Sequence, residues 1–254
     1  MQSPADSPFL TAAGGTTLPG TVKVTAHGTV TKVTVPAQRV WGFDYVWRLW
    51  KIFGAKSEAQ WAEGEVLNGG GGGYSATEPM PLYQRATSGT RQFKAVRYLT
   101  PAKYKNISGL RLPTAWKFDP APQVTAGTGT RRAVPDLSTS ADALMGGYEV
   151  YDPQFKPTPI QGFGGTSFVA PQLNGAAAVI NSYLGRRAGF WNPAIYRFAG
   201  RPGSPFTPLG MTGTSNDNLY YTGTPGRPYN VGSGLGVPHL FRLAEDFARF
   251  LGRN

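Results

Sequence analysis

The sequence predicts an α/β domain, because its size, its strand patterns and its helical patterns all agree with that class. The chain has 254 residues, of which 40% are hydrophobic, so it can bury a core as one substantial domain or two small ones. Residues 21–35 alternate valine with polar side chains around His27-Gly28, which predicts a β-hairpin. Residues 167–184 are rich in small and apolar side chains, and residues 239–253 place apolar side chains on one face, so each stretch predicts a helix.

Shorter patterns predict the remaining strands and loops. Residues 9–18 form an apolar run with Gly14-Gly15, which is typical of a buried strand that ends in a tight turn. Residues 133–139 and 147–152 also predict strands. The chain contains 34 glycines and 22 prolines, which indicates long loops. The glycines at 69–73 allow either a flexible link or a close approach of the backbone to a ligand.

The segment 40–53 is rich in large apolar side chains and contains three tryptophans. It could form a helix that binds a membrane surface or a partner, or it could pack onto the rest of the domain. We favour packing onto the domain.

The charge of the chain is strongly positive. It has 25 basic and 14 acidic residues, a net charge of +11, which raises the question of anionic partners. Residues 79–118 contain no acidic residue, and their eight basic residues are spread among aromatic ones. A nucleic-acid interface would need a recognisable binding fold or an aromatic platform, and the sequence has neither. We therefore expect a solvated basic surface and no nucleic-acid partner.

Several classes of protein are excluded. The chain has no cysteine, so disulfides, cysteine nucleophiles and cysteine-bound zinc are ruled out. Its first residues lack the charged and apolar regions of a signal peptide, and no stretch of about 18 apolar residues predicts a membrane span.

The segment GFGGTSFVAPQLNGAAAVIN, residues 162–181, is the most specific feature of the sequence. Gly164 and Gly165 let a peptide backbone come close, and Ser167 stands where a long helix begins, in a positive potential that favours developing negative charge. Ser167 is therefore the candidate nucleophile. The plainer alternative is that Ser167 only caps the helix, and we expect it at the N-cap position.

This segment resembles the nucleophile helix of the subtilisin and sedolisin superfamily, and four further blocks are similar to the sedolisins, the serine-carboxyl peptidases. These blocks are residues 6–18, residues 58–84, residues 132–148 and residues 184–196. The resemblance implies that residues 1–254 are the C-terminal part of a peptidase catalytic domain, with insertions near 38–57 and 85–127. It implies a subtilisin-like three-layer fold with a mainly parallel sheet, whose N-terminal portion is missing.

The resemblance also implies a function. A sedolisin is an acid-acting endopeptidase, so Ser167 is expected to form an acyl-enzyme with a peptide or protein substrate. Substrate contacts are expected from five residues of the glycine-rich segments: Gly72, Gly73, Gly164, Gly165 and Thr166. Family members imply a secreted or periplasmic location, and the missing N-terminal portion or a propeptide is an expected partner.

The acidic residues that a sedolisin needs are not found in the expected positions. In the family, a glutamate backed by an aspartate activates the serine, and a second aspartate helps to form the oxyanion hole. The Glu-x-x-x-Asp helix and the Ser-Gly-Asp loop both belong before the segment at which this chain begins. We therefore expect this chain alone to be inactive. The alternative is a non-catalytic, peptidase-like binding module.

A histidine does not replace these acids. Ala26-His27-Gly28-Thr29 is similar to a subtilisin His-Gly-Thr signature, but His27 lies within a strand pattern where a helix should begin. His239 begins the last helix, and a capping role is enough to explain it.

The calcium loop of the family is degenerate. Leu209, Gly226, Pro228 and Asn230 occupy its positions, but Pro208 and Asn230 replace both carboxylates, and calcium prefers charged oxygen ligands. We expect no metal or other cofactor, with calcium possible but disfavoured. Residues 216–218, Asn-Asp-Asn, are a conceivable substitute, although a polar surface turn is the simpler interpretation.

Overall fold

A three-stranded sheet lies at the centre of the computed structural model, in which strand β1 (Ala13–Thr17) has β4 (Arg39–Val40) on one side and β9 (Leu137–Ser140) on the other. The pair β1–β9 is parallel, with Ala13 opposite Leu137, and the pair β1–β4 is antiparallel. The last four residues of β1 are buried, which confirms the buried strand predicted within 9–18. The structure describes residues 4–26, 28–61, 68–156, 159–209, 221–222 and 226–252.

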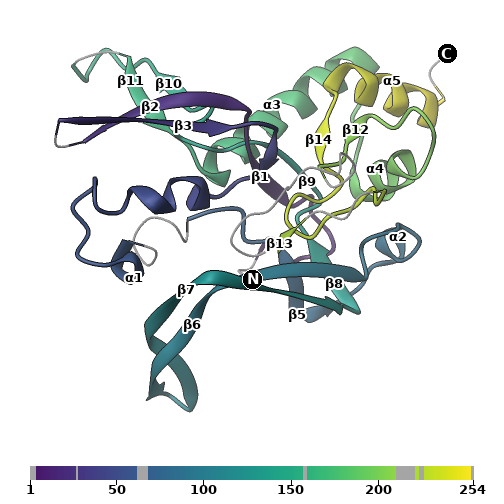
Figure 1. Ribbon diagram of the computed structural model, residues 1–254. Coiled ribbons are helices and arrows are strands. Elements are labelled where there is room, and N and C mark those ends of the chain that lie inside the picture. The colour runs from purple at the N-terminus through teal and green to yellow at the C-terminus, as the bar shows by residue number, and fades with distance from the viewer. Residues whose placement is uncertain are drawn as a thin grey trace.

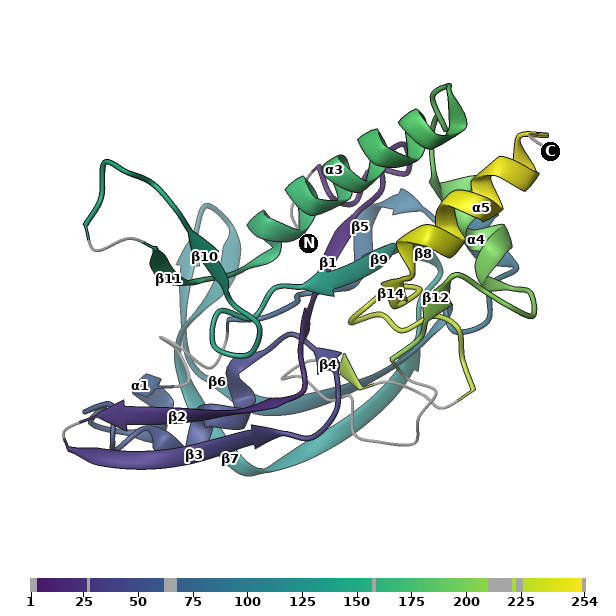
Figure 2. The same cartoon turned by 90° about the horizontal axis from the view of Figure 1, so that it is seen from above.

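Three helices form the main core with this sheet. Helix α3 (Thr166–Leu184) packs on β1 and β9, α5 (Leu240–Phe250) packs on α3, and α4 (Asn192–Ala199) packs on α5. In Figure 2, α3 runs across β1 and lies beside α5. The buried side chains that meet between these elements include Leu137, Ile180, Ile195, Phe198, Leu243 and Phe247.

A second, smaller core lies under the first hairpin. Strands β2 (Gly20–Ala26) and β3 (Thr29–Val35) pair antiparallel, as the sequence predicts, and the 3-10 helix η1 (Phe43–Leu49) packs on β3. Val24 and Val33 of the hairpin meet Val46 and Leu49 of η1. The segment 40–53 therefore packs onto the domain, which is the alternative favoured above, while His27 lies outside the described residues.

The middle of the chain forms a long ribbon. Strand β5 (Gly73–Pro79) pairs with β8 (Arg131–Val134), and α2 (Leu82–Arg85) follows β5. The antiparallel strands β6 (Gln92–Ile107) and β7 (Leu110–Thr128) form a ribbon whose turn lies far from the rest of the molecule (Figure 1).

The remaining elements are short. They are α1 (Glu58–Trp61), β10 (Tyr148–Val150), β11 (Ile160–Phe163), β12 (Phe206–Thr207), β13 (Tyr221–Thr222) and β14 (Val237–Pro238). Strand β13 pairs with β6, and β10–β11 and β12–β14 are antiparallel pairs. No helix within the described ranges is long and apolar enough to cross a membrane.

The fold agrees with the predicted α/β class only in part. Helices and strands are mixed as expected, but the sheets are small, and β1–β9 is the only parallel pair among the described strands. These strands therefore do not form the mainly parallel sheet that the resemblance implied. The three-layer, subtilisin-like arrangement stays a prediction, as do the boundaries of the two insertions.

One strand and the buried face of one helix differ from the sequence prediction. Residues 133–139 form two strands instead of one, because the chain breaks pairing at Pro135, which has no N–H to donate. In α5, Leu243 and Phe247 are buried, but Leu240 and Phe250 are exposed, so the apolar face in contact with the core is narrower than predicted. The Nδ1 atom of His239 accepts from the N–H of Arg242 at 3.4 Å, in line with the predicted capping role.

Candidate active site

Ser167 lies in the first turn of α3, with its side chain exposed. The predicted N-cap position is wrong, because Gly165 is the N-cap and no side chain caps this helix. Gly165 has φ 100°, a conformation that glycine adopts at little cost, and the bend places Thr166 as the first helical residue. The hydroxyl group of Ser167 forms no hydrogen bond with any part of the chain that the structure describes.

The loop before the serine is held by the segment after β9. The N–H of Gly165 donates to the carbonyl oxygen of Ala141 at 2.5 Å. A Cβ atom at Gly164 would lie 2.5 Å from the same oxygen and 2.6 Å from the backbone nitrogen of Ala143. Position 164 therefore requires glycine because the protein's own backbone fills the space. A contact between Gly164 or Gly165 and a substrate stays a prediction.

Asp142 organises the same segment. Its buried carboxylate accepts from the hydroxyl of Thr17 at 2.7 Å and from the hydroxyl of Tyr45 at 3.0 Å. It also accepts from the backbone N–H groups of Leu144 at 2.8 Å and Met145 at 3.0 Å. These bonds tie β1, η1 and the 141–145 turn together. Burial raises the pKa of the Tyr45 hydroxyl, and the charge of Asp142 raises it further.

Aromatic stacking fixes the other side of the first helical turn. The ring of Phe168 stacks on Tyr148 with a centroid distance of 5.0 Å and lies 5.9 Å from Phe163. The hydroxyl of Tyr148 donates to the carbonyl oxygen of Ser140 at 2.8 Å. The residue after the serine is thus held by the β10–β11 pair, which is in turn bonded to the end of β9.

A cleft of about 390 Å³ lies beside the serine loop. It is lined largely by glycine-rich backbone, and its walls include Gly14, Gly69, Gly70, Gly71, Gly72, Gly232, Val134, Pro135 and Thr166. The structure therefore brings together two of the predicted substrate residues, Gly72 and Thr166. Gly73 and Ser167 do not line the cleft. Gly73 is buried in β5 opposite Val134, and Ser167 is the residue after Thr166, which does line it.

The glycine run at 69–73 closely approaches other backbone segments. Gly72 has φ 52°, and a Cβ atom there would lie 2.0 Å from the carbonyl oxygen of Val231. The N–H of Gly70 donates to the carbonyl oxygen of Trp41 at 2.8 Å. The run is therefore not a free link, because it is held against the protein's own backbone, and a close approach of these glycines to a ligand stays a prediction. Gly71 differs, because a Cβ atom there would meet nothing within 4 Å.

A buried ion pair lies at the other end of β9. The Arg132 guanidinium donates twice to the carboxylate of Asp136, at 2.6 and 2.8 Å, and both side chains are fully buried. Asp136 also accepts from the backbone of Ala12 at 2.7 Å, from Tyr196 at 2.8 Å and from Asn192 at 3.2 Å.

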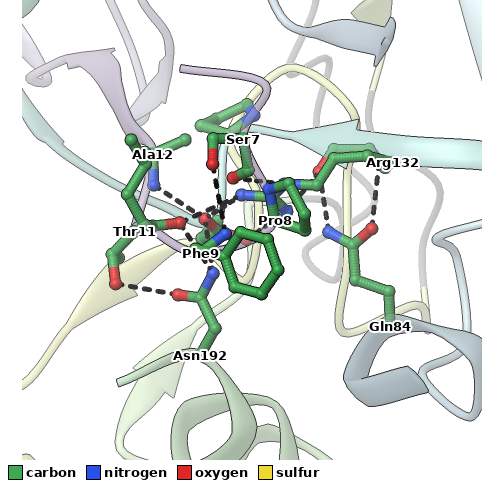
Figure 3. Close-up of polar contacts among 12 residues, drawn as sticks. Ser7, Pro8, Phe9, Thr11, Ala12, Gln84, Arg132 and Asn192 are labelled. Carbon is green, nitrogen blue, oxygen red and sulfur yellow. Dashed lines mark hydrogen bonds and ion pairs between the residues drawn. The ribbon is translucent and has the colours of Figure 1, made fainter. Parts of the chain in front are cut away.

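Figure 3 shows how this network gathers the segment Ser7–Ala12 with Gln84 of α2, Arg132 of β8 and Asn192 of α4. Burial raises the pKa of the neighbouring Tyr83 to about 12, and it also raises the pKa of Tyr196 and Tyr229. The network is satisfied internally, so its function is structural.

Asp136 and Asp142 are structural residues around the site that sequence reasoning missed. Asp136 and Asp142 appear in the sequence only as members of a family-like block, and no periodic pattern marks their partners. The one available signal is that each aspartate stands next to apolar residues at the end of a strand, where a buried charge needs several donors.

The degenerate calcium loop is only partly described. The Oδ1 atom of Asn230 accepts from the N–H of Gly232 at 2.7 Å, so this oxygen serves the turn at 230–234. Leu209 is buried, Gly226 has φ 77°, and the residues between them are described only at 221–222. No cluster of three or more acidic or histidine side chains occurs in the described parts. Weak or absent calcium binding stays a prediction, and Asn216, Asp217 and Asn218 lie outside the described residues.

Comparison with known proteins adds a distant relative. No protein-family model matches the chain. The chain is 26% identical over 244 residues to kumamolisin, a sedolisin from Bacillus sp. (strain MN-32). The match covers 95% of this chain and 31% of kumamolisin, so the chain spans about a third of that relative's length. The similarity supports a sedolisin-like relationship at the level of the family.

Proposed function

We propose that this chain carries the nucleophile of a sedolisin-type serine peptidase, with Ser167 as the attacking residue. The Ser167 oxygen adds to the carbonyl carbon of a peptide bond, its proton passes to a base, and the amine leaves with a proton. Water then hydrolyses the acyl-enzyme and restores the serine. The resemblance of five sequence blocks and the similarity to kumamolisin support this reaction class.

The observation that carries the proposal is the contrast between Ser167 and its neighbours. Gly164, Gly165 and Phe168 are all fixed by contacts with the 141–148 segment or with β11. The Ser167 hydroxyl has no partner among the described residues and faces solvent. A serine that only stabilised the helix start would accept from a backbone N–H of the first turn, so the structural alternative loses its main support.

The start of α3 also suits the charge that develops in the reaction. This helix has 19 residues, so its aligned peptide dipoles place a partial positive charge at Ser167. The N–H of Phe168 donates to the carbonyl oxygen of Gly165, whereas the N–H groups of Thr166 and Ser167 have no partner within the helix and can donate to an oxyanion. We infer that peptide lies along the cleft between Gly71, Gly72 and Thr166, with its scissile carbonyl at the helix start.

The described residues offer Ser167 neither a base nor an oxyanion aspartate. Asp142 and Asp136 are already bonded to several donors within the fold, and no carboxylate among the described residues bonds to Ser167. We propose that the glutamate–aspartate pair lies outside this chain and that the chain alone does not turn over substrate. A secreted or periplasmic location, with protein or peptide substrates, belongs to the same proposal.

The test compares two serines of the same helix. Hydrolysis of an unfolded protein at about pH 4 is measured for this chain together with the segment or separate chain that supplies the acids, and for its Ser167→Ala and control Ser182→Ala variants. Ser182 is exposed on α3, about four helical turns from Ser167. We expect Ser167→Ala to lose at least about 10³-fold in rate and Ser182→Ala to lose nothing. Cleavage that survives Ser167→Ala would remove this serine as the nucleophile.

A peptidase-like binding module is the second candidate function. The observation that favours it is the absence of a base bonded to Ser167 within the described residues. A binding module would hold peptide in the cleft without turnover, and Ser167→Ala would leave the affinity unchanged. Peptide binding measured by calorimetry, together with the hydrolysis assay, separates the two candidates.

A further inference from the structure

The β6–β7 ribbon projects from the molecule and carries a dense positive charge. Its two strands run from residue 92 to residue 128, and its turn at Ser108-Gly109 lies away from the sheet and helices (Figure 1). Residues 92–128 contain six basic residues and one acidic residue, Asp119, which lies away from the turn. The ribbon is independent of the cleft, so its role is separate from the proposed peptidase function.

Five basic side chains of the ribbon are exposed and have no acidic partner among the residues that the structure describes. This holds for Lys94, Lys103, Lys105, Arg111 and Lys117, none of which forms an ion pair within the described part of the chain. Three of them, Lys103, Lys105 and Arg111, lie in the outer third of the ribbon. A local excess of unpaired cations attracts an anionic partner.

The tip of the ribbon is apolar. Ile107 is the last residue of β6, it is 47% exposed, and its partner across the turn is Leu110. Side chains alternate along a strand, so Lys103, Lys105 and Ile107 share one face. The lysine two residues behind Ile107 stands about 7 Å back from it along the strand.

This spacing matches the surface of an anionic bilayer. An apolar side chain at the tip can enter the boundary between headgroups and acyl chains, while Lys105, about 7 Å behind it, meets the lipid phosphates and Lys103, about 13 Å behind it, faces the outer headgroup region. Tyr104, which is 45% exposed, and Arg111, which is opposite Asn106, lie on the other face of the ribbon near the tip. A bilayer that the tip enters end-on would meet both faces, and aromatic residues favour the membrane interface.

The same residues are less suited to nucleic acid. The guanidinium of Arg111 lies over the ring of Tyr104, 4.1 Å from its centroid. Tyr104 is the only exposed aromatic residue near the tip among the described side chains, and Arg111 covers one face of its ring, so that face cannot stack on a base. The exposed Ile107 at the tip adds nothing to phosphate binding.

We propose that the β6–β7 ribbon docks the protein on an anionic lipid surface, with Ile107 entering the interface and Lys103, Lys105 and Arg111 binding phosphate groups. Each cation near such a surface strengthens binding about fivefold, so the three together contribute roughly a hundredfold.

The experiment measures co-sedimentation with phosphatidylcholine vesicles that contain either no anionic lipid or roughly 40 mol % phosphatidylglycerol. The test variant is Lys103→Gln/Lys105→Gln/Arg111→Gln. The matched control is Arg186→Gln/Arg187→Gln/Arg242→Gln, which removes the same charge from exposed positions elsewhere. We expect binding to the anionic vesicles only, a loss of roughly a hundredfold in the ribbon variant and a much smaller loss in the control.

A second measurement does not depend on the folding of the triple variant. The chain has no cysteine, so Ile107→Cys accepts a single environment-sensitive dye. Val30→Cys, which is 59% exposed on the β2–β3 hairpin, is the control site. The emission of the dye at 107 should shift to the blue on anionic vesicles, and that of the dye at 30 should not.

Three results would overturn the proposal. Equal losses in the two triple variants would mean that only net charge matters. An absent shift at position 107 would mean that the tip does not enter the bilayer. Ribbon-dependent binding to a DNA oligonucleotide without binding to vesicles would assign the ribbon to nucleic acid instead.

Discussion

The hydroxyl group of Tyr45 donates to the carboxylate of Asp142, and its oxygen lies 3.0 Å from each carboxylate oxygen. This contact joins η1, which follows the first hairpin, to the turn that holds the serine loop. Asp142 does not touch Ser167, yet the backbone next to it fixes Gly164 and Gly165. Asp142 is thus a positioning residue for the candidate nucleophile.

Replacement of Asp142 by asparagine should destabilise the protein by about 3 kcal/mol, because an uncharged amide cannot accept from all of the donors that surround the carboxylate. Tyr45→Phe should cost about 1.5 kcal/mol, since it removes one bond to a charged group. Urea unfolding measures both values. Thr21→Ala, in an exposed hydroxyl pair with Thr34, should stay within about 0.5 kcal/mol of wild type and is the control.

Two glycines near the start and middle of α3 should respond in opposite directions to alanine. Gly164→Ala places a Cβ atom 2.5 Å from the Ala141 oxygen and should cost about 2 kcal/mol or more, with loss of any Ser167 activity. At Gly175, a Cβ atom meets nothing within 4 Å, so Gly175→Ala should stabilise the helix by about 0.5 to 1 kcal/mol. A tolerated Gly164→Ala would contradict the packing described for the serine loop. Thermal unfolding and activity assays provide the measurements.

The cleft can be blocked at Gly71 without strain in the fold. Gly71→Phe adds a large side chain where a Cβ atom has open space, so stability should change by less than about 0.5 kcal/mol. Peptide binding should weaken at least tenfold, as measured by calorimetry, because the ring fills the space between Gly72 and Thr166. Unchanged affinity would place the peptide site elsewhere.

The buried tyrosines should make the protein sensitive to alkali. Burial raises the pKa of Tyr83 to about 12 in the folded chain, so the unfolded chain releases this proton first, near pH 10. The stability that the neutral phenol contributes is therefore complete below about pH 10 and is lost as the pH rises towards 12. Tyr196 and Tyr229, whose pKa burial also raises, act in the same direction.

Urea midpoints measured between about pH 8 and about pH 11 test this sign. In Tyr83→Phe, the urea midpoint should fall less as the pH rises than it does in wild type. Tyr151→Phe removes a phenol that is 75% exposed, and its urea midpoint should fall as much as that of wild type. A midpoint that rises with pH would contradict the assignment.

Sequence patterns predict the local elements of this fold well, because the hairpin at 21–35 and helix α3 depend on contacts between near neighbours. The ribbon strands were not predicted, since Pro101 and Pro113 interrupt the alternation, and pairing continues past them through shifts of register. Tertiary context overrides the local signal there.

The candidate site is only partly readable from sequence for a different reason. Ser167 and the glycines stand in a contiguous motif, whereas the carboxylate of Asp142 finds its donors on β1 and η1, up to 125 residues away. In the network around Asp136, the side chain of Asn192 donates to the carbonyl oxygen of Leu10, which lies 182 positions away in the sequence. One-dimensional patterns contain no signal for such partners.

The parallel pairing of β1 with β9 has a consequence for the order of folding. Ala13 and Leu137 are 124 positions apart in the sequence and pair only when the chain between them closes into a loop, whereas the hairpins close over a few residues. Closing a long loop is slow because its entropy is lost before the contact forms. The hairpins and the ribbon should therefore fold early, and the cleft, whose walls include Gly14 of this pairing and Val134 at the end of β8, should be among the last features to assemble.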